Sequence, residues 1–243
     1  CAFMYTYPVT EPPALSLSIQ ETNAISCNSS NTFSNPSADG ELTASASGGV
    51  PFNPLIDGFY AYIYTWKKKD SSGVWQTIAG ETTDTLTDID AGEYAVNIED
   101  ANGIIVGTYT NNVLTTANDF KYTLIEPNLL QVSLTKTDVF CHNGSDGTIT
   151  PTITGGTGNY TITWNTGATT QNLRDLAIGT YTISVTDQKG CKAAASIIIS
   201  QPDNPIEIVY TFFEPTFAGA TDGWVKATIT GGTSLADGSY TFL

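Results

Sequence analysis

The chain has 243 residues, of which 40% are hydrophobic and only 14% are charged. A formal net charge of −15 argues against nucleic acids and anionic membrane surfaces as partners. The sequence contains no apolar run of about 18 residues and therefore predicts no membrane insertion. Its many Thr, Ser, Gly and Tyr residues are typical of an extracellular all-β protein built from short strands and turns.

One pattern occurs three times along the chain. An Asp-Gly pair opens each occurrence, and a Gly-Gly pair follows eight residues after the opening glycine; the openings are Asp39-Gly40, Asp146-Gly147 and Asp222-Gly223. Residues 86–94 align with residues 173–181 at a constant shift of 87 positions. Self-similarity at a fixed offset indicates tandem modules.

The alignment of these repeats predicts four parts, with Pro12, Pro127 and Pro202 at the joints. They are the last strand of a preceding module (1–12), a module with an extended hairpin and longer loops (13–127), a second module (128–202) and the first half of a further module (203–243). Joints of one or two prolines have little slack, so we expect a semi-rigid, extended array.

Within each module the strands follow a period of two. After the Asp-Gly openings, apolar residues alternate with polar ones, as in Leu42, Ala44 and Ala46. The later strands that begin at Tyr94 and Tyr181 repeat this alternation, which is typical of strands with one buried face. The sequence therefore predicts antiparallel β-sandwiches of immunoglobulin-like type, with Trp66 and Trp164 in their cores.

The chain has four cysteines. In the second module Cys141 precedes the Asp-Gly strand and Cys191 opens the last strand. We predict a disulfide between them, which would close a loop of 50 residues and stabilise the fold by roughly 4 kcal/mol. Cys27 has the position of Cys141, but its expected mate falls at Ile104, which leaves a bond to Cys1 as an option. Disulfides are typical of secreted proteins.

Several separated elements of the second module resemble the SprB repeat of Bacteroidota surface proteins. In order, they are Cys141 to Gly147, Gly155 to Tyr160, Trp164, Leu176 to Tyr181, Asp187 to Cys191, and the closing Gln201-Pro202. Residues 13–127 depart from the pattern because they lack the last cysteine and extend a hairpin between Lys67 and Glu81. Residues 203–243 match only its opening half.

The resemblance implies a segment of a very large cell-surface adhesin, exported by the type IX secretion system and located on the outer surface of the cell. It also implies a non-catalytic stalk that takes part in surface attachment and gliding motility. The partners it implies are neighbouring modules of the same chain and the gliding or secretion machinery. Two alternatives remain: a module that binds polysaccharide, and an accessory module of a secreted hydrolase.

No pattern in the sequence predicts an enzyme or a cofactor. The only histidine, His142, follows Cys141 in a turn, and no Gly-x-Ser-x-Gly or phosphate-binding loop is present. Of the neighbouring acids Asp84, Asp88 and Asp90, only Asp88 recurs in the second module, as Asp175. We therefore predict no catalytic residue.

The sequence leaves a few candidate binding residues. Calcium could bind at module joints through acids that could equally serve as turn formers, and we assign no metal ligands; these acids are Asp39, Asp100, Asp146 and Asp187. Trp224 is expected on the outward face of its strand, as a sugar-stacking residue or as a contact between modules. Trp75, in the extended hairpin, is a second candidate for ligand contact.

Overall fold

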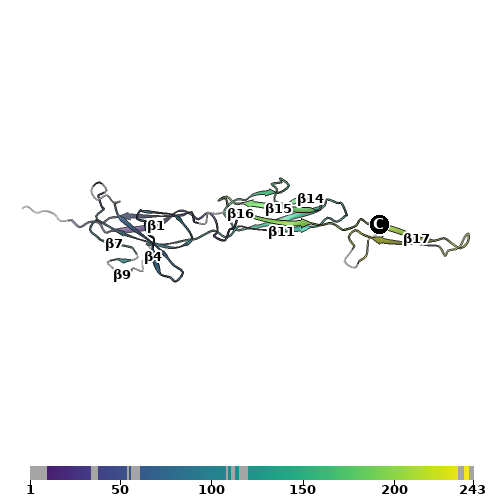
Figure 1. Cartoon of the computed structure of the whole chain (residues 1–243), viewed down its shortest axis with the longest axis horizontal. Helices are drawn as coiled ribbons and strands as arrows, with labels where there is room; N and C mark the ends of the chain where they lie inside the picture. The colour runs from purple at the N-terminus through teal and green to yellow at the C-terminus, as the bar shows by residue number, and fades with distance from the viewer. Residues whose placement is uncertain are drawn as a thin grey trace, which may run out of the picture. The chain divides into compact units, whose positions relative to one another are not determined.

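The computed structural model describes residues 10–33, 38–53, 55, 61–107, 109–110, 113–114, 120–234 and 238–240. Its regular elements are the strands β1 to β18 (Figure 1). In this part of the chain, no helix is long and apolar enough to cross a membrane. Two compact units are present: residues 1–129 with 189–191, and residues 130–188 with 192–243. Cys1 and most of the strand expected within residues 1–12 lie outside the described residues.

The first unit contains an antiparallel β-sandwich. One sheet has the order β1 (Ser16–Asn23), β2 (Gly40–Ser47), β5 (Thr85–Ile89). The other has the order β10 (Lys121–Leu124), β6 (Gly92–Glu99), β3 (Ile63–Lys69), β4 (Trp75–Thr77), and β7 (Ile105–Val106) also pairs with β6. The short strands β8 (Tyr109–Thr110) and β9 (Val113–Leu114) pair with each other.

The second unit contains a smaller sandwich and a separate strand pair. One sheet of the sandwich has the order β11 (Gln131–Thr137), β12 (Gly147–Thr154), β14 (Leu173–Leu176). The other has the order β13 (Thr161–Trp164), β15 (Gly179–Thr186), β16 (Lys192–Ile199). The pair is β17 (Glu207–Phe213) with β18 (Trp224–Thr230). All these strand pairings are antiparallel. Both sandwiches are immunoglobulin-like, as the alternation of apolar residues predicts.

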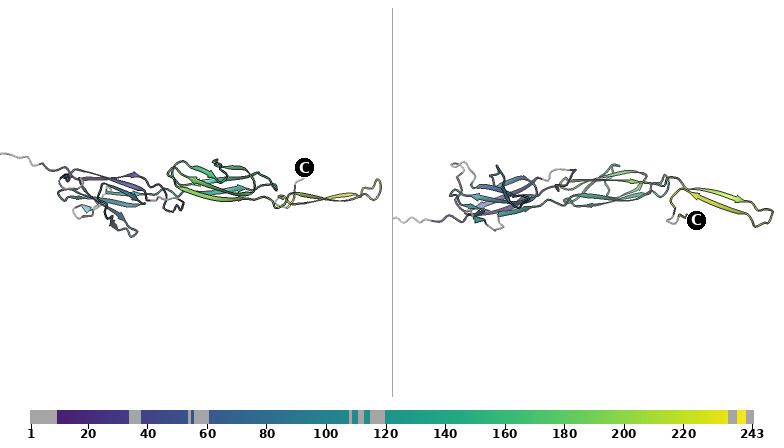
Figure 2. Two further views of the ribbon diagram at one scale, coloured as in Figure 1. Left: turned by 45° about the horizontal axis from the view of Figure 1, so that its top comes forward. Right: turned by 60° about the horizontal axis from the view of Figure 1, so that its bottom comes forward.

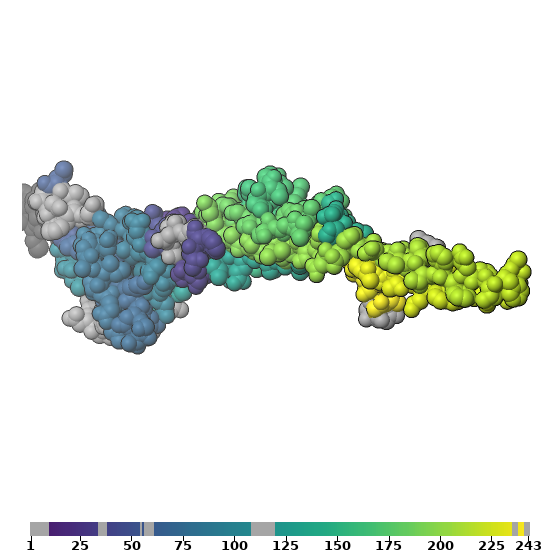
Figure 3. All heavy atoms as spheres, turned by 45° about the vertical axis from the view of Figure 1, so that its right-hand side comes forward, coloured from purple at the N-terminus to yellow at the C-terminus, as the bar shows by residue number. Residues whose placement is uncertain are grey.

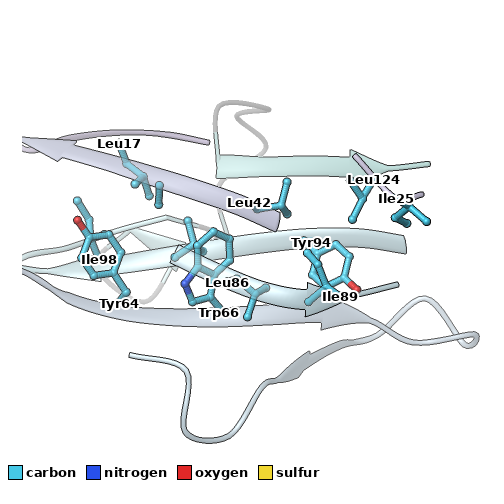
Figure 4. Packing of buried hydrophobic residues seen from close by; sticks show 12 residues of the cluster. Leu17, Ile25, Leu42, Tyr64, Trp66, Leu86, Ile89, Tyr94, Ile98 and Leu124 are labelled. Atoms are coloured by element: carbon cyan, nitrogen blue, oxygen red, sulfur yellow. The ribbon is translucent and has the colours of Figure 1, made fainter. Parts of the chain in front are cut away.

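Apolar residues from both sheets form the core of the first sandwich (Figure 4). Trp66 and Tyr94 come from one sheet and Leu42 from the other, and each is at most 1% exposed. Because Leu42 and Ala44 alternate with polar residues along β2, only one face of this strand is buried. The same alternation places Tyr94, Val96 and Ile98 in the core.

The second sandwich buries the corresponding positions. Trp164 is 2% exposed, and Ile149, Ile183 and Val185 are fully buried. The indole Nε1 of Trp66 donates a hydrogen bond to the carbonyl oxygen of Thr83 at 2.9 Å, and that of Trp164 donates to Thr170 at 2.9 Å. The predicted burial of both tryptophans is therefore confirmed, and each indole N–H has the partner that a buried donor requires.

A tyrosine corner recurs in the two sandwiches. The hydroxyl of Tyr94 donates to the carbonyl oxygen of Asp90 at 2.8 Å, and that of Tyr181 donates to Ala177 at 3.1 Å. In both cases the acceptor lies four residues upstream. This contact is a hallmark of immunoglobulin-like domains, where it fixes the corner between two strands.

The strands β17 and β18 form a two-stranded ribbon without a second sheet among the described residues (Figure 2). Both faces of the ribbon are exposed, with Phe212 and Val225 on one face and Phe213 and Trp224 on the other. The expected distinction between an inward and an outward face therefore does not apply to these strands in this structure.

Candidate functional site

The structure joins Cys27 to Cys191, so the predicted bond between Cys141 and Cys191 is wrong. The Cα atoms of Cys27 and Cys191 are 5.6 Å apart, a usual separation for a disulfide. Cys141 is a free thiol and is exposed. The bond between Cys1 and Cys27 is also excluded, because Cys27 is already bonded.

The geometry of β16 explains this correction. Cys191 immediately precedes the first residue of β16. Cys141 lies beyond the other end of this strand, because Nδ1 of its neighbour His142 is 2.9 Å from the carbonyl oxygen of Pro202. The eight residues of the strand span roughly 26 Å at about 3.3 Å per residue. A disulfide needs Cα atoms within about 7 Å, so Cys141 and Cys191 cannot meet.

Cys27 has the same place in the first sandwich that Cys141 has in the second. The side-chain amide of the adjacent Asn28 donates to the carbonyl oxygen of Pro127 at 3.0 Å and to Glu126 Oε1 at 3.0 Å. Cys27 thus lies beside the residues with which the first repeat ends. The bond to Cys191 connects two successive repeats of the sequence, and both cysteines belong to the first compact unit.

The acids considered for calcium accept hydrogen bonds from the backbone of turns and loops. Asp100 accepts from the N–H groups of Val50, Asn102 and Ile104 at 2.9 to 3.0 Å, and Asp187 accepts from Thr157 at 2.7 Å. Asp39 and Asp146 accept from Ser26 and Phe140. Among the described residues, no group of three or more His, Cys, Asp or Glu side chains could hold a metal ion. These contacts favour the turn-forming role.

Asp88 is the one acid of Asp84, Asp88 and Asp90 that recurs in the second module, and its role is to adopt an unusual backbone conformation. Asp88 and Asp175 have φ angles of 55° and 56°, in the left-handed region that short polar residues tolerate best after glycine. The pairing register shifts beside each of them, between β2 and β5 and between β12 and β14. The recurrence of this acid therefore reflects a β-bulge.

Trp224, the second candidate for ligand contact, lies at the start of β18. It is 53% exposed and stacks against Phe213 of β17, with ring centroids 6.5 Å apart and an interplanar angle of 14°. Phe213 is also its partner in the strand register. The exposed indole thus belongs to an aromatic pair at the end of the ribbon.

Trp75, the first candidate, lies in a row of residues on the outer face of the first sandwich. In the register of the sheet, Trp75 of β4 is opposite Lys69 of β3. In a second row, Ala95 of β6 lies between Lys67 of β3 and Lys121 of β10 and is opposite both. Directly opposed residues of antiparallel strands point to the same face. Because Lys67 and Lys69 alternate with the buried Trp66, this face is the one turned away from the core.

Two lysines approach the indole of Trp75. Lys69 Nζ is 5.8 Å and Lys121 Nζ is 6.0 Å from the centroid of its rings, which is within cation–π range. Lys69 also contacts both carboxylate oxygens of Glu93 at 3.0 Å, whereas the ion pairs found among the described residues do not include Lys121. Partial burial lowers the pKa of Lys67. We call Trp75, Lys67, Lys69 and Lys121 the Trp75 surface.

The turn of the hairpin holds Trp75 in place. Asp70 accepts hydrogen bonds from the N–H groups of Ser72 and Val74 at 2.9 Å and from the side-chain amide of Gln76 at 2.9 Å. Gly73 has a φ of 82°, which a residue with a side chain rarely adopts. The hairpin protrudes from the first sandwich (Figures 1 and 3).

Lys68 points the other way and has a structural role. Its ammonium pairs with Asp90 and lies 5.4 Å from the ring centroid of Tyr94. Burial, followed by the hydrogen bond and charge of Asp90, raises the pKa of Tyr94. The Lys68 contacts thus reinforce the tyrosine corner. Sequence reasoning singled out Trp75 but missed its lysine neighbours, because the strand register that assembles them is not readable from spacing.

Comparison with solved structures gives distant matches. The three N-terminal domains of the Hoc outer capsid protein of bacteriophage RB49 match with 17% identity and a TM-score of 0.46, over 93% of this chain and 72% of that one. The eight N-terminal Ig domains of Down syndrome cell adhesion molecule match with 16% identity and a TM-score of 0.29, over 74% of this chain and 23% of that one. Four Ig domains of Dscam1 isoform 6.9 match with 15% identity and a TM-score of 0.29, over 68% of this chain and 41% of that one.

Comparison with curated protein sequences gives no match. The sequence model of one family does match: the SprB repeat, over residues 133–169. This segment runs from β11 through β13 and contains the Asp-Gly opening, the Gly-Gly pair and the buried Trp164. Residues 133–169 therefore match the SprB repeat, and the matched segment lies in the second sandwich.

Proposed function

We propose that this chain is a non-catalytic stalk segment of a large secreted adhesin on the outer surface of the cell, where it takes part in surface attachment and gliding motility. The SprB repeat at residues 133–169 is the observation that carries the proposal. The proposed stalk units are the repeats 13–127 and 128–202, and residues 203–243 open a further one. Export by the type IX secretion system and contact with the gliding machinery are part of the same proposal.

The disulfide supports a mechanical role. A covalent bond between residues 164 positions apart, in two successive repeats, resists their separation under load in a way that packing alone does not. A disulfide of this kind also persists in an oxidising environment outside the cytoplasm. The turn acids support the non-catalytic part of the proposal, because Asp100 and Asp187 are buried and bonded to backbone N–H groups.

Replacement of the segment in the parent protein tests this proposal. We expect deletion of residues 13–202 to reduce attachment of the cells to a surface and their movement over it. A pair of unrelated immunoglobulin-like domains of similar length should restore both, because a stalk acts through its length and stiffness. Unchanged attachment after the deletion would contradict the stalk role. Failure of the unrelated domains to restore attachment would point instead to a specific binding role.

A further inference from the structure

The positive charge of the first repeat is concentrated at one place. Residues 13–127 contain 14 acidic and only 4 basic residues, and all four basic residues are lysines. Three of these lysines, together with Trp75, make up the Trp75 surface; the fourth is Lys68, which pairs with Asp90. A strongly acidic repeat thus places two of its four lysines, Lys69 and Lys121, within 6.0 Å of the centroid of one aromatic ring system.

From this arrangement we propose that the Trp75 surface binds an acidic polysaccharide, a polymer of uronic-acid sugars. The indole offers an apolar platform for the C–H face of a pyranose ring, as aromatic side chains do when one side of a ligand is apolar and the other polar. The ammonium groups of Lys69 and Lys121, close to the indole, suit the carboxylates of the sugar. The proposal is separate from the stalk role, since it concerns one repeat and not the array.

Charge complementarity selects the occupant. Within the Trp75 surface Lys69 is already bound to the carboxylate of Glu93. Lys121 has no such carboxylate partner among the described residues, so a bound uronate would supply one. The net charge of −15 disfavours polyanions on the chain as a whole, so we expect the affinity for a polyuronate to arise at this surface, where lysines are concentrated.

The geometry of the sheet also suits a polymer. Lys67 and Lys121 flank Ala95 in one cross-strand row; Ala95 itself is fully buried, so the two lysines are the groups of this row that can reach a ligand. Adjacent strands lie about 4.8 Å apart, so the row runs for roughly 10 Å across the sheet from Lys67 to Lys121, which is enough to contact more than one sugar. A hairpin fixed by the hydrogen bonds of Asp70 holds the indole beside this row, and such preorganisation favours binding.

Binding of the 243-residue chain to alginate, a polyuronate, at about 0.1 M salt tests the proposal. At this ionic strength the Debye length is about 10 Å, so distant acids are largely screened. We expect alginate to bind at least five-fold more tightly than neutral dextran. Trp75→Ala should weaken alginate binding at least ten-fold, Trp75→Phe should retain most of it, and Lys121→Gln should weaken it several-fold and reduce its dependence on salt.

Matched variants on the ribbon serve as controls. Trp224→Ala and Lys226→Gln remove an exposed tryptophan and a lysine far from β4 in the sequence, and they should leave alginate binding unchanged. The thermal unfolding of Trp75→Ala and Lys121→Gln should match that of the unaltered chain, which separates loss of binding from loss of fold.

The proposal is overturned if the unaltered chain does not bind alginate, if Trp224→Ala weakens binding as much as Trp75→Ala, or if single-stranded DNA binds more tightly than alginate. Failure here leaves the stalk role standing, because that role depends on the length of the array.

Discussion

Cys27 and Cys191 lie 164 positions apart in the sequence and are joined by a disulfide. The first belongs to repeat 13–127 and the second opens the last strand of repeat 128–202. Cys141, which has the position of Cys27 in the next repeat, is a free and exposed thiol. The bond therefore connects one repeat to the next and does not close a repeat on itself.

This pairing predicts the reactivity of the three cysteines that the structure describes. We expect a maleimide to label Cys141 in the folded chain without reductant, because its thiol is exposed. Cys27 and Cys191 should remain unlabelled until a reductant is added, because they are bonded and at most 2% exposed. Peptide mapping by mass spectrometry distinguishes the sites and should recover a peptide pair that joins Cys27 to Cys191.

A Cys141→Ser variant is the control for the mapping. It should keep the same cross-linked peptide pair and lose only the label at position 141. Recovery of a peptide pair that joins Cys141 to Cys191 in the unaltered chain would contradict the pairing.

Each buried tryptophan should be essential to the stability of its own sandwich. Trp66→Ala and Trp164→Ala remove a side chain that is at most 2% exposed and orphan the backbone carbonyl that its N–H bonds. We expect a loss of about 3–5 kcal/mol in the free energy of unfolding of the affected sandwich. Denaturation in guanidinium chloride, followed by far-ultraviolet circular dichroism, measures it.

Trp224→Ala is the matched control, because its indole is 53% exposed. It should change the free energy of unfolding by no more than about 0.5 kcal/mol. A loss of no more than about 0.5 kcal/mol in all three variants would contradict the core role of the two buried indoles.

Local patterns carried most of the fold prediction. Alternation along β2 and β6 is visible within eight residues, and it identified the buried face of both strands correctly because side chains of a strand alternate between its faces. The corner formed by Tyr94 and Asp90 was not predicted, although its spacing of four residues also falls within a local window. Local features of this kind recur in both sandwiches, so the sequence displays each of them in two places.

Features that depend on distant strands were not predictable in this way. The repeat pattern aligns Cys27 with Cys141, but it does not show which of the two lies near the end of β16 that carries Cys191. That position determines which cysteine forms the disulfide with Cys191. The lysine neighbours of Trp75 depend on the register of four strands, which places Lys121 near an indole from a different hairpin. A one-residue change of register would move these side chains to the opposite face.

The left-handed residues of the bulges should limit substitution there. At Asp175, where φ is 56°, a β-branched side chain meets steric conflict that glycine avoids. We expect Asp175→Val to lower the free energy of unfolding by about 1–2 kcal/mol, while Asp175→Gly changes it by no more than about 0.5 kcal/mol. Arg174→Val, an exposed substitution in the same strand and without a positive φ, is the control and should be nearly neutral. An Asp175→Val variant as stable as Arg174→Val would refute the conformational argument.

Asp100 should make the first sandwich sensitive to acid. Burial raises the pKa of Asp100, but hydrogen bonds from Val50, Ile104 and Asn102 outweigh burial and hold it below its ordinary value of 3.8. A carboxyl whose pKa is lower in the folded than in the unfolded chain stabilises the fold above the unfolded value. This contribution is lost as the pH falls from about 3.8 through the folded pKa.

The variant Asp100→Asn isolates this contribution. It keeps the shape of the side chain but replaces a charged acceptor, so we expect it to lower the free energy of unfolding at pH 7 by about 1.5–3 kcal/mol. Since Asp70, Asp90, Asp138 and Asp222 also have lowered pKa values, both proteins should lose stability in acid, and only their difference reports on Asp100. Urea denaturation between pH 7 and pH 2.5 should show this difference shrink as the pH falls below about 3.8. A difference that stays constant over this range would mean that the charge of Asp100 does not stabilise the turn.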